Sequence, residues 1–211
     1  MIAVSKFLLN LFRVKLVIKR LSPSIKPGSL IVANHISTID MPLIASETET
    51  RFVTSMEVRN SPLTGLISTI AGAIFVDRKS IKTLRNDITR IAKLLKAGVN
   101  VTVFPEATSS NGSTVLPFKA ALFEAARIAN APIQPVAIQY NSPSTVGYYG
   151  DMSFIPHVLR LFIHKSIAVQ VTWLQQRNFL DTSAKEMAEL CRSDILSHIE
   201  PICNKKETLK A

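Results

Sequence analysis

Residues 29–40 read Ser-Leu-Ile-Val-Ala-Asn-His-Ile-Ser-Thr-Ile-Asp, an apolar run that leads directly into a polar segment with a His. The run at 29–33 has the length of a buried strand, and residues 36–46 favour a helix in which Pro42 is tolerated only near the start. This pattern predicts a strand followed by a helix, with His35 at the edge of a sheet, where open α/β folds bind ligands.

The same alternation of strands and helices continues along the chain. Strands are predicted at 51–55, 73–76, 99–104, 132–140 and 166–173. Helices are predicted at 62–71, 80–97, 118–130 and 182–199. Strands that alternate with helices are typical of α/β folds, and 211 residues suit one domain. We therefore expect a single α/β domain with a mixed sheet flanked by helices.

Residues 3–21 are both apolar and basic. Their apolar residues recur at three- and four-residue steps, which predicts an amphipathic helix. The stretch contains several Lys and Arg residues, and no acidic residue occurs before Asp40. Such a helix either packs on its own domain or lies on an anionic membrane surface, and the charge favours the membrane. We predict a membrane-associating helix with its linker at 1–27 and the main domain at 28–211.

The charge balance limits the classes of partner. Twenty-five Lys and Arg against fifteen Asp and Glu give a net charge of +10, which attracts nucleic acid or anionic lipid. The aromatic residues do not interleave with the basic ones, and no nucleic-acid motif is present, so no nucleic-acid partner is expected. No uncharged apolar run reaches about 18 residues, and no signal-peptide pattern is evident. These features predict a peripheral or monotopic membrane protein.

Two cysteines lie near the carboxyl terminus, Cys191 and Cys203. They are too few for a disulfide framework, and their spacing does not suit a metal site. We expect both to be free thiols.

Three polar segments follow predicted strands. They are Asn34–Asp40, the strand end at 73–79 that contains Arg78, and the loop Phe104–Gly112. A carboxylate five residues after a His can orient the imidazole, although this spacing also arises by chance when the His caps a helix. The loop can hold an anionic head group or can be a simple capped turn, and Arg78 can bind phosphate or only solvent.

Together these segments resemble the glycerolipid acyltransferases typified by lysophosphatidic acid acyltransferase. The family has four ordered blocks, which stand here as NHISTID at 34–40, GAIFVDR at 72–78, FPEATSS at 104–110 and QPVAIQY at 134–140. The resemblance covers roughly residues 28–174. It implies transfer of a fatty acyl group from acyl-CoA or acyl carrier protein to the hydroxyl of a lysolipid, in membrane lipid biosynthesis.

The resemblance also implies roles for individual residues. His35 is the general base for the acceptor hydroxyl, and Asp40 supports it. Arg78 and the loop of Glu106, Ala107, Thr108 and Ser109 position the acceptor. Pro135 helps to shape the acyl-donor site. No metal and no cofactor besides the acyl carrier are implied.

The sequence departs from the family pattern in the third block. Ala107 replaces the family's Gly, and Ser109 replaces an Arg, which removes a strong phosphate contact. Lys119 is a candidate to supply the missing charge, or is a solvated helix residue. The stretch TSSNG…LPFKAALFEAA also resembles a bacterial subgroup that includes lyso-ornithine-lipid acyltransferases. Asp151 and His157 are a possible polar pair, for which we favour a structural role.

We expect the protein at the cytoplasmic face of a bacterial inner membrane, with anionic lipids as partners. A non-catalytic lipid-binding module is the alternative from another class, and the intact His35 and Asp40 argue against it. Neither Cys lies near a block, which disfavours an acyl-enzyme intermediate.

Overall fold

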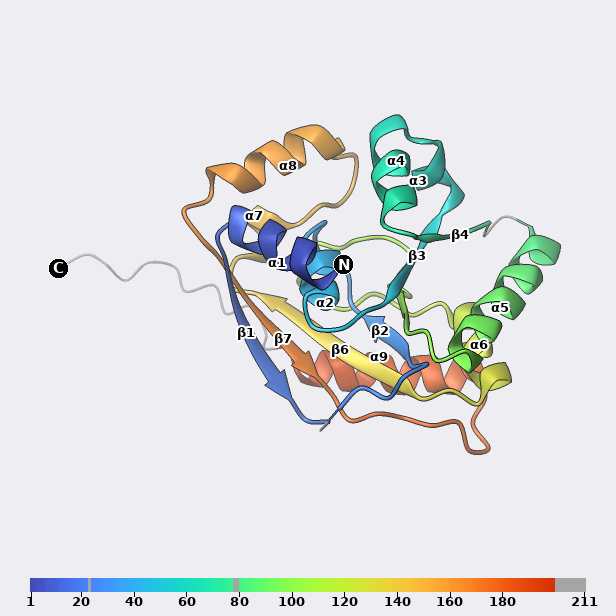
Figure 1. The fold of residues 1–211 in the computed structure, drawn as a ribbon. Coiled ribbons are helices and arrows are strands. Elements are labelled where there is room, and N and C mark those ends of the chain that lie inside the picture. Colours follow the sequence, from blue (N-terminus) through green and yellow to red (C-terminus); the bar gives the residue numbers. More distant parts are fainter. Residues whose placement is uncertain (23, 78–79, 200–211) are drawn as a thin grey trace.

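The predicted strands assemble into one mixed sheet in a computed structural model of the chain, which describes residues 1–22, 24–77 and 80–199 (Figure 1). Within these residues the sheet has seven strands in the order β1-β7-β6-β2-β5-β3-β4. They are β1 (Val14–Arg20), β2 (Leu30–Ala33), β3 (Arg51–Ser55), β4 (Ile74–Val76), β5 (Val101–Val103), β6 (Ile133–Tyr140) and β7 (Ile167–Trp173). Strands β6, β2, β5, β3 and β4 run parallel, β7 is antiparallel to β6, and β1 is parallel to β7.

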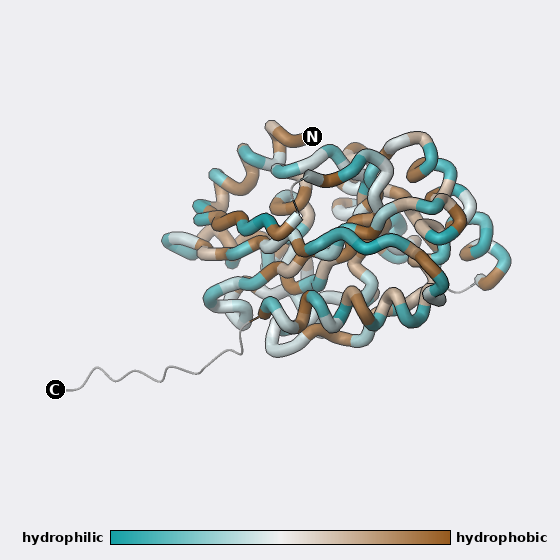
Figure 2. The backbone as a smooth tube through the Cα atoms, turned by 90° about the horizontal axis from the view of Figure 1, so that it is seen from below, coloured by the Kyte–Doolittle hydropathy of each residue, from teal (hydrophilic) through white to brown (hydrophobic). Residues whose placement is uncertain are grey.

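Helices cover both faces of this sheet (Figure 1). They are α1 (Ile2–Leu11), α2 (Asp40–Ala45), α3 (Met56–Asn60), α4 (Pro62–Ile70), α5 (Ile81–Lys96), the 3-10 turn η1 (Ala120–Leu122), α6 (Phe123–Ala129), α7 (Pro143–Val146), α8 (Phe154–Ile163) and α9 (Ala184–Ser197). The coils of the outer helices alternate between hydrophilic and hydrophobic residues (Figure 2). This alternation is the pattern of helices with one face on a core.

Strand β2 lies in the middle of the sheet and contributes to two cores. Leu30 and Val32 pack with residues of α5, α6 and α9 on one face. Ile31 and Ala33 pack with residues of α1, α2 and α8 on the other. All four residues of β2 are buried, because successive side chains of a strand point to opposite faces. The central position of β2 fixes the segment that follows it, which begins at Asn34.

The structure confirms the predicted α/β fold and the mixed sheet. Each strand predicted from residue 29 onward is present, with ends that differ by no more than two residues. The long predicted helices at 62–71, 80–97 and 182–199 correspond to α4, α5 and α9. The helix predicted at 118–130 is divided into η1 and α6.

The helix predicted at 3–21 is wrong in its second half. Helix α1 ends at Leu11, and Arg13 has a left-handed φ of 53°, which a right-handed helix does not continue through. Residues 14–20 form β1 instead and pair with β7 from Val14 to Arg20. The alternation of half-buried Val14 and Leu16 with exposed Lys15 is a strand pattern, and pairing with an open sheet edge outweighs the helical periodicity.

Helix α8 lies in a stretch for which the sequence analysis predicts no element. Its apolar residues do recur at helical spacing, but Pro156 and the Gly-rich residues before it obscured the pattern. No helix in the described ranges is long and apolar enough to cross a membrane.

Candidate active site

The segment after β2 wraps around the carboxylate of Asp40. Asp40 is fully buried, and its Oδ2 accepts hydrogen bonds from the backbone N–H groups of Ile36 at 2.6 Å and Ser37 at 2.9 Å. The same oxygen lies 2.8 Å from Nδ1 of His35. The first turn after the strand is therefore irregular, and it folds around the acid instead of continuing as a helix. This geometry explains how a carboxylate five residues later meets the imidazole.

The other oxygen of Asp40 is held from a neighbouring strand. The hydroxyl of Tyr140, at the end of β6, donates to Oδ1 of Asp40 at 2.7 Å. Burial, and then the nearby Asp40 carboxylate, raise the pKa of Tyr140 well above its ordinary value, so the phenol stays a donor. Both carboxylate oxygens are thus satisfied inside the protein, which fixes the position of Asp40.

The imidazole of His35 is oriented by Asp40 and by an aromatic stack. Its ring lies parallel to Phe104, with ring centroids 4.1 Å apart and planes 18° apart. The carboxylate of Asp40 beside Nδ1 selects the tautomer in which Nδ1 carries the proton and Nε2 carries a lone pair. The side chain of His35 keeps 21% of its surface exposed, whereas Asp40 keeps none. His35 is the member of the pair that a substrate can reach.

Glu106 holds the backbone of the site. Its Oε1 accepts from the N–H of His35 at 2.7 Å, and its Oε2 accepts from the N–H of Leu116 at 2.9 Å. Burial is the main reason that the pKa of Glu106 is raised to about 7, against the effect of these two hydrogen bonds. Both oxygens face backbone groups, so Glu106 connects the loop after β5 to the segment after β2.

Further hydrogen bonds fix the backbone on both sides of His35. The amide of Asn34 pairs with both backbone groups of Ile138 in β6, at 2.8 and 2.9 Å. The N–H of Ser110 donates to the carbonyl of His35 at 2.9 Å, and the N–H of Tyr148 donates to that of Ile36 at 2.8 Å. The position of His35 is therefore determined by β6, by the loop after β5 and by the segment around residue 148.

His157 supports the same segment from α8. It is buried, and its Nε2 lies 3.1 Å from the hydroxyl of Thr38, while its Nδ1 lies 3.3 Å from a guanidinium nitrogen of Arg160. Burial, and then the charge of Arg160, lower the pKa of His157 to about 4, so its ring is neutral at pH 7. Asp151 is exposed. The packing of His157 agrees with the structural role predicted for it.

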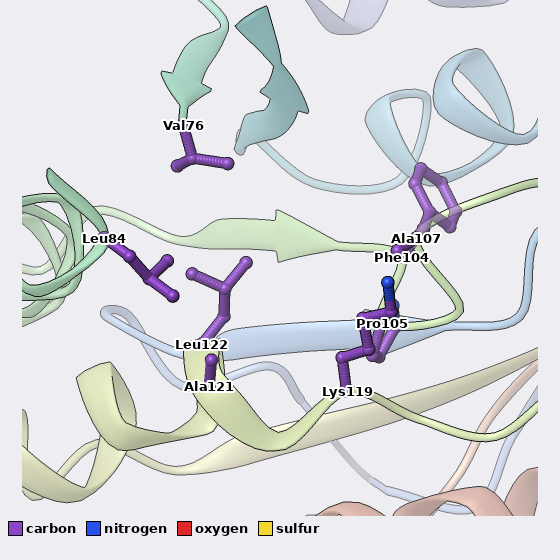
Figure 3. A pocket seen from close by; sticks show the side chains of 8 residues that line it. All are labelled: Val76, Leu84, Phe104, Pro105, Ala107, Lys119, Ala121 and Leu122. Atoms are coloured by element: carbon purple, nitrogen blue, oxygen red, sulfur yellow. The ribbon is translucent and has the colours of Figure 1, made fainter. Parts of the chain in front are cut away.

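A small cavity of about 140 Å³ lies next to Phe104 (Figure 3). Its walls are mostly apolar, and they come from β4, α5, the loop after β5 and η1. They are Val76, Leu84, Phe104, Pro105, Ala107, Lys119, Ala121 and Leu122. The amine of Lys119 points toward the loop at Ala107 (Figure 3). The cavity therefore combines an apolar wall with one cation, and it shares Phe104 with the ring stack of His35.

The predicted third-block residues occupy different positions in this loop. Ala107 has a left-handed φ of 63°, a conformation in which Gly is unstrained, and it lines the cavity. Thr108 is exposed. Ser109 is partly buried and donates to the carbonyl of Tyr148. The hydroxyl of Ser109 thus makes a backbone contact at the position where the family has an Arg.

The two remaining predicted residues are Pro135 and Arg78. Pro135 is buried within β6, opposite Val32 of β2, and is not among the residues that line the cavity. Arg78 lies outside the described residues. The roles predicted for both stay predictions.

Tyr140 and Phe104 are the site residues that sequence reasoning did not single out. A signal for Tyr140 exists, because it is a polar aromatic residue at the carboxyl end of an otherwise buried strand. Phe104 stands directly before the Pro-Glu of the third block. Both belong to the quoted blocks, but no spacing rule identifies a stacked ring or a phenol that reaches the first residue of α2 from β6.

The described residues offer few other reactive groups. Cys191 is free and buried in α9, where burial raises its pKa to about 12, so it is a protonated thiol at neutral pH. Cys203 lies outside the described residues. In the described part of the chain, no three His, Cys, Asp or Glu side chains gather closely enough to hold a metal ion.

Known acyltransferases are similar to this chain in sequence. The 1-acyl-sn-glycerol-3-phosphate acyltransferase of Neisseria gonorrhoeae is 29% identical over 177 residues, which cover 82% of this chain and 69% of that protein. The lyso-ornithine lipid O-acyltransferase of Pseudomonas aeruginosa is 32% identical over 167 residues, which cover 77% of this chain and 63% of that protein. The chain thus spans about two thirds of the length of these relatives.

A solved structure shares the fold. The 1-acyl-sn-glycerophosphate acyltransferase of Thermotoga maritima superposes with a TM-score of 0.66 at 21% identity, covering 92% of this chain and 76% of that one. The family model described as Acyltransferase matches residues 13–139, a range that includes His35, Asp40 and Glu106. The chain therefore belongs to the acyltransferase family.

Proposed function

We propose that the protein is an O-acyltransferase that moves a fatty acyl group from acyl-CoA or acyl carrier protein to the hydroxyl of a lysolipid. The observation that carries the proposal is the contact between Nδ1 of His35 and the buried, fully hydrogen-bonded Asp40. This contact leaves Nε2 of His35 as a base on the exposed side of the pair.

The chemistry follows from that tautomer. A lipid hydroxyl has a pKa far above 7 and attacks a thioester slowly. Nε2 of His35 accepts its proton as the oxygen bonds to the thioester carbonyl carbon, and Asp40 stabilises the imidazolium that forms. The carbon–sulfur bond then breaks, and the thiol leaves with the proton from His35. Such general base catalysis typically contributes ~10²–10⁴-fold to the rate.

No acyl-enzyme is part of this proposal. The described cysteine, Cys191, is buried with a pKa of about 12, in the core formed with α5 and α6. Direct transfer requires only that donor and acceptor be held together next to His35, which itself provides a large entropic advantage. We propose no metal and no cofactor besides the acyl carrier.

The acceptor is proposed as 1-acylglycerol-3-phosphate or a related lysophospholipid, with lyso-ornithine lipid as the alternative. Lys119 lines the cavity and is proposed to bind a phosphate or carboxylate group of the acceptor. Arg78 is proposed as a second cation that binds the same group. Ser109 in place of the family's Arg favours an acceptor that needs fewer charged contacts. One relative is named for 1-acyl-sn-glycerol-3-phosphate and another for lyso-ornithine lipid, so each alternative has the support of one name.

We propose that the enzyme acts at the cytoplasmic face of a bacterial inner membrane, bound to anionic lipids. Helix α1 supports this, because Val4, Phe7 and Leu11 are exposed and Lys6 is the charged residue of the helix. Extracting an acyl chain into water costs ~0.8 kcal/mol per methylene, so an enzyme with two lipid-like substrates benefits from a membrane location.

The test is acyl transfer by purified protein from labelled acyl thioester to a panel of acceptors. The panel holds lysophosphatidic acid, lysophosphatidylcholine, lysophosphatidylethanolamine and lyso-ornithine lipid, in detergent. Product on one acceptor supports the proposal and identifies the substrate. Free fatty acid without diacyl product indicates a thioesterase, and no turnover on any acceptor favours a non-catalytic lipid-binding module.

A further inference from the structure

Helix α8 packs two polar side chains against the protein and exposes several of its large apolar ones. The buried residues of α8 are His157 and Leu161, and Arg160 reaches inward to donate to the carbonyl of Gly147 at 2.7 Å. Its outer side carries three large aliphatic side chains at helical spacing, Ile155, Leu159 and Ile163, and Ile163 is 81% exposed. Phe162 is partly exposed, and its ring packs against that of Phe12.

Helix α4 has the same inverted arrangement. Its one buried residue is Gly65, which packs so closely on the carbonyl of Arg59 in α3 that a larger side chain has no room. Thr64 also faces inward, and its hydroxyl donates to the carbonyl of Val58 at 3.4 Å. Its outer side is aliphatic. The exposed residues are Leu63, Leu66, Ile67 and Ile70, and Ile70 is 79% exposed.

Helices α5 and α9 show the ordinary arrangement. Ile91 and Leu95 of α5, and Met187 and Ile195 of α9, are buried, while their Lys and Glu residues face outward. A water-soluble helix places its apolar stripe on the core. The reversal in α4 and α8 shows that their outer sides are suited to an apolar medium, since soluble proteins rarely expose large apolar patches without a binding function.

Both helices stand over the edge of the sheet at which His35 lies (Figure 1). Helix α4 follows α3 at the carboxyl end of β3, and α8 contacts the segment after β2 through His157 and Thr38. In Figure 1, α8 and α4 lie on opposite sides of this edge, with α2 below and between them. Two outward apolar surfaces therefore flank the segment that carries the candidate base.

The charges around these helices favour an anionic partner. Neither α4 nor α8 contains an Asp or a Glu. Among the described residues, three exposed cations lie at the margins of these helices: Arg59 in α3, Lys165 after α8, and Arg13, whose guanidinium lies at the carbonyls of Phe162 and His164. They outnumber the two exposed acids there, Glu57 in α3 and Asp151 before α8. Helix α9 on the opposite face of the sheet carries three acidic and two basic residues. An apolar surface with basic residues at its margin matches the interface of an anionic bilayer.

We propose that the outer sides of α4 and α8 form one bilayer-docking surface that seats the His35 site on an anionic membrane. The apolar side chains enter the boundary between head groups and acyl chains, and Arg59 and Lys165 lie among the head groups. The lysolipid acceptor then keeps its acyl chain in the bilayer while its hydroxyl reaches His35. This last point rests on the proposed acyl transfer, whereas the docking rests on the membrane location proposed above and identifies the surface that makes the contact.

The test compares full-length variants with matched charge changes. One variant carries Leu159→Glu and Ile163→Glu in α8, and a second carries Leu66→Glu and Ile70→Glu in α4. The control carries Ile128→Glu and Leu180→Glu, which replace exposed aliphatic residues away from α4 and α8. Circular dichroism melting verifies that each protein folds. Flotation with phosphatidylcholine vesicles, with and without phosphatidylglycerol, measures binding.

The proposal predicts that each α4 and α8 variant loses at least about tenfold in partition coefficient on the anionic vesicles, while the control binds like the original protein. Equal binding by all folded variants would overturn it. So would a dimer in sedimentation that the α4 and α8 variants disrupt while their vesicle binding is retained. Acyl transfer in detergent is measured separately, so an inactive protein that shows the predicted binding pattern refutes the proposed function and leaves the docking surface supported.

Discussion

Two buried carboxylates contact His35, and the protein uses them differently. Asp40 belongs to the same segment as His35, accepts from two backbone N–H groups and a phenol, and faces the imidazole ring. Glu106 comes from the loop after β5 and accepts from the backbone N–H of His35 and Leu116. Asp40 contacts the imidazole ring of His35, whereas Glu106 contacts the backbone N–H of the same residue. We therefore expect Asp40 to affect the rate and Glu106 to affect mainly the fold.

The sharpest test of this difference is Asp40→Asn. The amide keeps the size of the side chain but removes the charge that selects the tautomer and stabilises the imidazolium. We expect kcat to fall by ~10²–10⁴-fold, with a smaller change in KM. Steady-state kinetics on the acceptor identified in the panel measure it. A drop of less than about tenfold would remove Asp40 from the chemistry.

Glu106→Gln is the matching change on the other carboxylate, and its main effect is on stability. Burial raises the pKa of Glu106 to about 7 in the folded state. The folded protein therefore holds the proton more tightly than the unfolded chain, so this group's contribution is complete below pH ~4.5 and is lost as the pH rises through 7. The contribution amounts to about 3 kcal/mol.

Urea unfolding of both proteins between pH 4 and pH 8 measures this contribution. The free energy of unfolding of the original protein, relative to that of Glu106→Gln, should fall over this range. Parallel profiles would show that Glu106 keeps an ordinary pKa. A loss of kcat as large as that of Asp40→Asn would show that Glu106 takes part in the chemistry and would end the distinction between the two acids.

Tyr140→Phe tests the hydrogen bond from the phenol of Tyr140 to Oδ1 of Asp40. The change leaves Oδ1 of Asp40 buried without its donor, which costs about 1–3 kcal/mol of stability. Since Oδ2 keeps its contacts with the backbone and with His35, we expect kcat to fall by about tenfold or less. Thermal melting and kinetics on the same preparation measure both effects. An unchanged melting temperature would show that the phenol is not needed to hold Asp40.

Phe104→Leu is expected to have the smallest effect. It replaces the ring that stacks on His35 with an aliphatic side chain, and aromatic pairs contribute about 0.5–1.5 kcal/mol beyond their buried area. We expect a reduction of kcat of a few fold, with Asp40 still orienting the ring. A loss approaching that of Asp40→Asn would show that the stack, and not the carboxylate, positions His35.

The sequence indicated His35 and Asp40 because both lie in one short segment after a strand. Their mutual contact required an irregular turn, which the structure shows as two backbone N–H groups bound to the carboxylate. Glu106 was predicted to position the acceptor. In the structure its oxygens face backbone N–H groups that are 71 and 10 residues away in sequence. A motif alone carries no information on which way a side chain points.

The fold was predictable where periodicity was unambiguous. Strands β2 to β7 and helices α5 and α9 have long or uniformly apolar patterns. Residues 14–20 fit both a helix and a strand, and the partner that decides, β7, lies about 150 residues later in the chain. Helix α8 was missed although its apolar residues recur at helical spacing, because Pro156 and the turn residues before it are typical of a loop.

The most direct test of the central claim is acyl transfer from labelled thioester to the acceptor panel, with His35→Ala beside the original protein. We predict diacyl product on one acceptor and a loss of kcat of ~10²-fold or more in His35→Ala, in a protein that thermal melting shows to be folded at the assay temperature. Product formed at a near-normal rate by folded His35→Ala would contradict the assignment of His35 as the base.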